Sequence, residues 1–140
     1  MRIFLDANIL VSVLNKEYPL YTYTARIVSL ADHKSFEVFT SPMCLAIAFY
    51  FAEKKNKKTA RGKIRLLGEK LSIAAVSEST VGKTSRNSAI HDFEDGLEYY
   101  AALESMCECI ITEDVKDFYF SDIDVLSAEG FFDKYFRSKH

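Results

Sequence analysis

The chain has 140 residues, a formal net charge of −2 and 49% hydrophobic residues, which is typical of a folded globular protein and predicts a single domain over residues 1–140. Its three cysteines show no zinc-type or C-x-x-C spacing, so we expect small core residues in a reducing compartment. There is no signal-peptide pattern and no apolar run long enough to span a bilayer, which excludes a membrane protein and favours a soluble, cytoplasmic one.

The N-terminal half alternates strand and helix patterns. We expect strands at residues 2–6 and 36–40, and helices at 7–14, from about 19 to 31, and at 42–55. The pair Ser41-Pro42 is a helix start, with serine as N-cap and proline at the first position. The helix at 42–55 is apolar almost all round and is therefore expected to be buried.

The C-terminal half continues the alternation. It predicts a basic helix at 57–70, a strand at 71–76, a polar helix-length segment at 79–89, a helix opening with Asp92 and Asp95, strands at 109–112 and about 123–126, and a last helix from about 127. This order indicates an α/β fold with a mostly parallel sheet covered on both faces. No glycine-rich phosphate loop follows any strand, which argues against a dinucleotide-binding or P-loop protein.

Charge is distributed unevenly along the chain. Between Lys54 and Lys70 there are eight basic residues and one acidic residue, whereas between His91 and Asp133 there are thirteen acidic residues and one basic residue. Each run alone is typical of a solvated helix face, but together they would allow one segment to hold a polyanion and another to hold cations. The candidate phosphate-contacting residues are Lys54, Lys55, Lys57, Lys58, Arg61, Lys63 and Arg65.

Several carboxylates are expected at one edge of the sheet. Asp6 follows the first strand and Asp114 follows the strand at 109–112. A crossover helix runs antiparallel to the strands, so its first turn, with Asp92 and Asp95, lies at the same carboxyl edge. Open α/β sheets bind ligands there. If the first strand neighbours the strand at 109–112, Asp6 and Asp114 face each other.

Carboxylates without histidine or cysteine partners favour Mg²⁺ or Mn²⁺, and such a site can hydrolyse phosphodiesters. Each acid also has a plainer interpretation. Asp6 would cap the next helix, an N-cap role accounts fully for Asp92 and leaves Asp95 as the stronger ligand candidate, and Asp114 and Asp117 could initiate a turn.

Four further polar residues lie close to these acids in the sequence. Asn8 and Thr112 could orient ligands or satisfy local backbone groups. Glu94 and Glu98 are expected to be solvated charges on a helix face.

At these residues the chain resembles the PIN-domain family, which includes VapC-type toxins. The matching segments are Phe4-Leu5-Asp6-Ala7-Asn8, Thr40-Ser41-Pro42, Asp92-Phe93-Glu94-Asp95-Gly96-Leu97, and the run from Ile110 to Phe118. The resemblance implies a three-layer α/β/α sandwich and an Mg²⁺- or Mn²⁺-dependent endoribonuclease. It implies that Asp6, Asp95 and Asp114 are the catalytic metal ligands, with Asp117 and Asp92 in support. It also implies RNA as substrate, a VapB-like antitoxin and a homodimer as partners.

One position departs from the family pattern. The helix that begins with the Ser-Pro pair usually carries a glutamate in its second turn, where this chain has Ile47, and the next acid is Glu53. The alternative is therefore a degenerate PIN module that binds RNA or an antitoxin without cleavage. A receiver- or phosphatase-type domain is disfavoured, because Asp6-Ala7-Asn8 offers only one acid.

Overall fold

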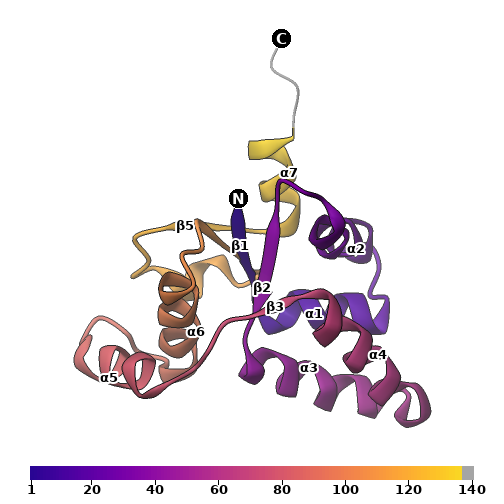
Figure 1. The fold of residues 1–140 in the computed structure, drawn as a ribbon, viewed down its shortest axis with the longest axis horizontal. Helices are drawn as coiled ribbons and strands as arrows, with labels where there is room; N and C mark the ends of the chain where they lie inside the picture. The colour runs from indigo at the N-terminus through magenta and orange to yellow at the C-terminus, as the bar shows by residue number, and fades with distance from the viewer. Residues whose placement is uncertain (137–140) are drawn as a thin grey trace.

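The computed structural model describes residues 1–136, which form a five-stranded parallel sheet with helices on both faces (Figure 1). The strand order is β3-β2-β1-β4-β5. The strands are β1 (Arg2–Leu5), β2 (Glu37–Thr40), β3 (Ser72–Ile73), β4 (Cys109–Ile111) and β5 (Asp124–Leu126). The predicted α/β/α class is confirmed, and β1 does neighbour β4, with Phe4 paired with Ile110.

Helices separate the strands along the chain. They are α1 (Ala7–Asn15), α2 (Tyr21–Ser29), α3 (Pro42–Lys55), α4 (Lys57–Lys70), α5 (Glu78–Arg86), α6 (Phe93–Glu104) and α7 (Ala128–Tyr135), with short 3₁₀ helices η1 (Leu30–Asp32) and η2 (Val115–Phe118). Helices α5 and α6 lie on one side of the central strands, and α1, α3 and α4 lie on the other (Figure 1). Within residues 1–136, no helix has the length and apolar character needed to cross a bilayer.

The core lies around the two central strands. Ile3, Phe4 and Leu5 of β1 and Ile110 and Ile111 of β4 are fully buried, as expected for parallel strands covered on both faces. All three cysteines are buried and free, which confirms their prediction as core residues.

Side-chain caps hold three helix starts at the carboxyl edge of the sheet. The Ala7 amide donates to Asp6 Oδ1 at 2.7 Å, and the Cys44 amide donates to Ser41 Oγ at 3.1 Å. Asp92 caps α6 by accepting from the amides of Glu94 and Asp95. Each cap satisfies amides that have no partner inside the helix, so the first turns of α1, α3 and α6 are fixed where the strands end.

Helix α3 corrects the expectation that it is buried all round. Only Cys44, Ala48 and Ala52 are buried along it, whereas Tyr50 and Phe51 are 53% and 44% exposed. The buried residues are small and spaced by four, so they form one stripe against α1, and the rest of the helix lies on the outside of the layer.

Other expectations at the edges of the fold were also wrong in part. Strand β3 has two residues rather than the six expected, because it pairs only with the end of β2. Two large apolar side chains at these edges are exposed, Leu66 of α4 at 63% and Tyr135 of α7 at 40%.

Candidate metal centre

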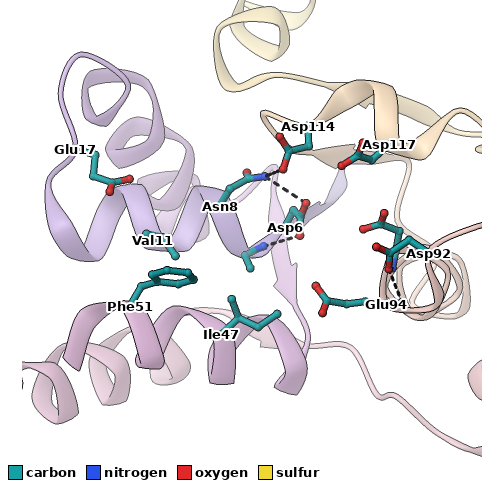
Figure 2. Close-up of a pocket in the computed structure, with 12 residues that line it drawn as sticks. Asp6, Asn8, Val11, Glu17, Ile47, Phe51, Asp92, Glu94, Asp114 and Asp117 are labelled. Carbon is teal, nitrogen blue, oxygen red and sulfur yellow. Dashed lines mark hydrogen bonds between the residues drawn. The ribbon is translucent and has the colours of Figure 1, made fainter. Parts of the chain in front are cut away.

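A cavity of about 460 Å³ opens at the carboxyl edge of the sheet, between α1, α3, α6 and η2 (Figure 2). Seven of its lining side chains are acidic, and no lysine or arginine of residues 1–136 lines it. The lining residues are Asp6, Ala7, Asn8, Val11, Glu17, Ile47, Phe51, Asp92, Glu94, Asp95, Asp114 and Asp117. The structure thus brings together all five aspartates predicted from the sequence.

Asp6 is the buried member of this group, and its carboxylate is held by defined donors. Oδ1 accepts from the Ala7 amide, and Oδ2 accepts from Thr112 Oγ1 at 2.8 Å. Thr112 is fully buried at the end of β4, and its Oγ1 also accepts from the Asp114 amide at 3.0 Å. One threonine hydroxyl therefore fixes both Asp6 and the loop that carries Asp114.

Asn8 joins the same two aspartates across the cavity floor. Its Nδ2 donates to Asp114 Oδ2 at 3.1 Å and to Thr112 Oγ1 at 3.0 Å, with a longer contact of 3.4 Å to Asp6 Oδ2. Its Oδ1 accepts from the Glu113 amide at 3.1 Å, which sets the orientation of the amide group. Asn8 and Thr112 therefore do orient carboxylates in this structure.

Helix α6 supplies the opposite wall of the cavity. Burial, and then the negative charges of Asp92 and Asp6, raise the pKa of Asp95 to about 7. Burial and Asp92 also raise the pKa of Glu94, which is exposed as expected but lines the cavity (Figure 2). Asp117 lines the cavity from η2. Such mutual repulsion indicates a site that lacks positive charge.

Glu98 is the acidic residue that sequence reasoning misplaced. It is fully buried rather than solvated, and the Cys44 thiol donates to its Oε1 at 3.0 Å. Its Oε2 has no hydrogen-bond partner. Burial, and then Asp6, raise the pKa of Glu98 to about 10. The available signal was its position three residues after Asp95, which places both side chains on the same face of α6.

The basic residues predicted to contact phosphate lie on α4 and the end of α3, outside the cavity lining. Two of them are used within the fold, since Lys55 Nζ donates to the Asn15 carbonyl and Lys63 Nζ donates to the Leu14 carbonyl at the end of α1. The exposed residues of the set are Lys54, Lys55, Lys57, Lys58, Arg61 and Arg65.

The donor set fits a divalent cation such as Mg²⁺ or Mn²⁺. Its lining acids supply hard oxygen atoms, which these ions prefer. The orphaned Oε2 of Glu98 beside Asp6 is a second indication, because leaving a buried acceptor without a partner costs about 1–3 kcal/mol. Ile47 faces the cavity from α3 and offers no atom that could bind a metal ion (Figure 2).

The chain is similar to known proteins in sequence and in fold. The PIN domain family model matches residues 2–116. Ribonuclease VapC1 of Aquifex aeolicus is 26% identical over 138 residues, which cover 96% of this chain and 95% of that protein.

Two solved structures share the fold. One is a chain of VapBC2 from Rickettsia felis, in a structure with a DNA fragment from the VapBC2 promoter. It has a TM-score of 0.68 and 21% identity, and the match covers 91% of this chain and 98% of that chain. The other is Mycobacterium tuberculosis VapC20, a Sarcin-Ricin loop cleaving toxin, with a TM-score of 0.64 and 14% identity over 87% of this chain and 98% of that chain. Because the family model spans most of the sequence, the chain belongs to the PIN domain family.

Proposed function

We propose that this chain is a cytoplasmic, divalent-metal-dependent endoribonuclease of the VapC toxin type. The observation that carries the proposal is the convergence of Asp6, Asp95 and Asp114 on one cavity that no basic side chain of the described residues lines. In a PIN domain chain with similarity to Ribonuclease VapC1, that arrangement favours hydrolysis of RNA phosphodiester bonds.

In this proposal, Asp6, Asp95 and Asp114 hold Mg²⁺ or Mn²⁺. When bound, the ion would supply Lewis-acid stabilisation of phosphate charge and lower the pKa of a water molecule. Asn8 and Thr112 keep Asp6 and Asp114 in place through their hydrogen bonds.

Asp92 and Asp117 add negative charge beside the proposed ligands. The charges of both residues help to raise the pKa of Asp95, so a nearby cation relieves repulsion as well as gaining a ligand.

RNA would extend from the cavity onto neighbouring surfaces, and a protein partner would bind exposed surface as well. Exposed cations on α4, including Lys57, Lys58 and Arg61, would neutralise backbone phosphates without reading sequence. The similarity to VapBC2 favours a VapB-like antitoxin as the protein partner, and we include a homodimer in the proposal. The exposed aromatic side chains of Tyr50 and Phe51 on α3 would suit a protein contact.

One observation favours a second function. Ile47 removes a carboxylate from the cavity wall, so the chain could bind RNA or an antitoxin without cleaving RNA. Both functions predict RNA binding, and only the first predicts metal-dependent cleavage.

Cleavage of an end-labelled structured RNA separates the two functions. We expect cleavage by wild type with Mn²⁺, no cleavage with EDTA, and loss of at least 100-fold in rate for Asp95→Asn purified in parallel. RNA binding without cleavage by wild type would support the degenerate module. Cleavage that is equal in wild type and Asp95→Asn would exclude this site as its source.

A further inference from the structure

We infer that Glu98 is an additional carboxylate ligand of the cation bound by Asp6, and that α6 supplies this ligand where α3 offers only Ile47. The inference rests on the proposed metal site. It adds a residue that does not line the cavity, because Glu98 is fully buried.

The first observation is a buried oxygen without a partner. Glu98 Oε1 accepts from the Cys44 thiol at 3.0 Å, which leaves the carboxyl group held by one oxygen. Glu98 Oε2 is buried and has no hydrogen-bond partner among residues 1–136. Buried polar atoms are nearly always paired, so an orphaned carboxyl oxygen beside a second carboxylate indicates a place for a proton or for a cation that displaces it.

The second observation is distance. Ligand atoms of Asp6, Cys44 and Glu98 all lie within 4.8 Å of one another. A metal ion that binds oxygen at 2.0–2.1 Å places adjacent ligand oxygens about 3 Å apart and opposite ones about 4.2 Å apart. Asp6 and Glu98 can therefore hold one ion after a small side-chain shift, while Cys44 keeps its hydrogen bond to Glu98.

The third observation is the direction from which the side chains come. Asp95 and Glu98 are three residues apart on α6 and project from the same face of the helix. Asp95 lines the cavity beside Asp6, and the Glu98 carboxylate lies within 4.8 Å of the Asp6 carboxylate. Both acids of α6 would then reach an ion bound by Asp6, which compensates for the carboxylate that Ile47 does not provide.

Glu98→Gln tests the inference by Mn²⁺ calorimetry on the full chain, because it keeps the shape and the Cys44 contact but removes the charge. We expect Mn²⁺ affinity to fall at least tenfold. The melting temperature of the metal-free protein should stay the same or rise, since the amide can donate to Asp6. Glu104→Gln removes the same charge at the far end of α6, where it pairs with Lys83, and should leave affinity within twofold.

The outcomes also separate this inference from the proposed function. If Asp95→Asn loses Mn²⁺ affinity and Glu98→Gln stays within twofold of wild type, Glu98 is only a structural partner of Asp6 and the inference is overturned. If Asp95→Asn and Glu98→Gln both bind as wild type does, the whole site has been misplaced. Should Glu98→Gln fail to fold, Glu98→Asp, which shortens the ligand, replaces it with the same expected loss of affinity.

Discussion

Ile47→Glu tests whether the cavity wall limits metal binding. Ile47 is half-buried and lines the cavity that also contains Asp6 and Glu94. Without metal, the change removes about half of an isoleucine's burial, about 1 kcal/mol, and adds repulsion of about 1 kcal/mol from neighbouring acids. For a chain of this size, a loss of about 2 kcal/mol lowers the melting temperature by about 8 °C.

Metal should reverse most of this loss. If the new carboxylate binds the ion and strengthens Mn²⁺ affinity tenfold, saturating Mn²⁺ returns about 1.4 kcal/mol of stability relative to wild type. The melting difference between wild type and Ile47→Glu should then shrink from about 8 °C in EDTA to about 2 °C in Mn²⁺. Thermal melts followed by circular dichroism, together with calorimetric titration, measure both quantities.

A matched control uses the same substitution elsewhere. Ile64 is half-buried on α4 and does not line the acidic cavity, so Ile64→Glu should gain nothing specific from Mn²⁺. If Ile47→Glu lowers the melting temperature by the same amount in EDTA and in Mn²⁺, with no gain in metal affinity, a carboxylate at position 47 does not reach the ion.

Three further outcomes are expected. Replacing three exposed cations of α4 by glutamate (Lys57, Lys58 and Arg61) should weaken RNA binding and reduce the slope of log affinity against log salt by about 2, and an unchanged slope would remove α4 from the RNA surface. The folded-state pKa of Asp95 is about 7, which lies above its ordinary value. The folded chain therefore binds more protons than the unfolded chain between about pH 4 and 7. Its stability falls as pH rises through that window. In EDTA, the melting temperature of Asp95→Asn minus that of wild type should therefore increase as the pH is raised from 5 to 8. A difference that stays constant with pH would argue against the raised pKa. Gly96→Ala should destabilise by about 1–3 kcal/mol in urea melts, since its Cβ would lie 2.4 Å from Thr84 Cγ2, while Gly62→Ala, with open space around it, should be neutral or stabilising.

The convergence of the acids could be predicted from the sequence because local signals fix it. Asp6 ends an apolar strand and caps the helix that follows, and Asp92 caps the helix that leads into β4. Strand and helix alternation then forces a parallel sheet, and its carboxyl edge collects the strand ends and the helix starts together.

The burial of Glu98 could not be predicted in this way, because it depends on tertiary packing. Helix α5 packs against α6, so that Gly96 lies against Thr84 and α6 is covered on more than one side. The apolar Leu97 and Tyr100 are only half-buried, while Glu98 is fully buried. Helical periodicity gives the relative direction of side chains but not how many neighbours cover the helix.

The dependence of burial on tertiary packing also explains why the exposed apolar residues of α3 and α4 were not predicted. Their apolar content predicted helices correctly but could not show that Phe51 and Leu66 lie on the outside of the layer. Exposed apolar residues of this kind carry no periodic signal that distinguishes an uncovered face from a core face.

Anomalous diffraction from a crystal of the chain soaked in Mn²⁺ tests most directly whether the acidic cavity is a metal centre. We expect a manganese peak bonded to carboxylate oxygens of Asp6, Asp95 and Asp114, at distances of about 2.0–2.2 Å. A saturating soak that gives no peak in the cavity, or a peak bound by none of these three aspartates, would contradict the assignment of the acidic cavity as a metal centre.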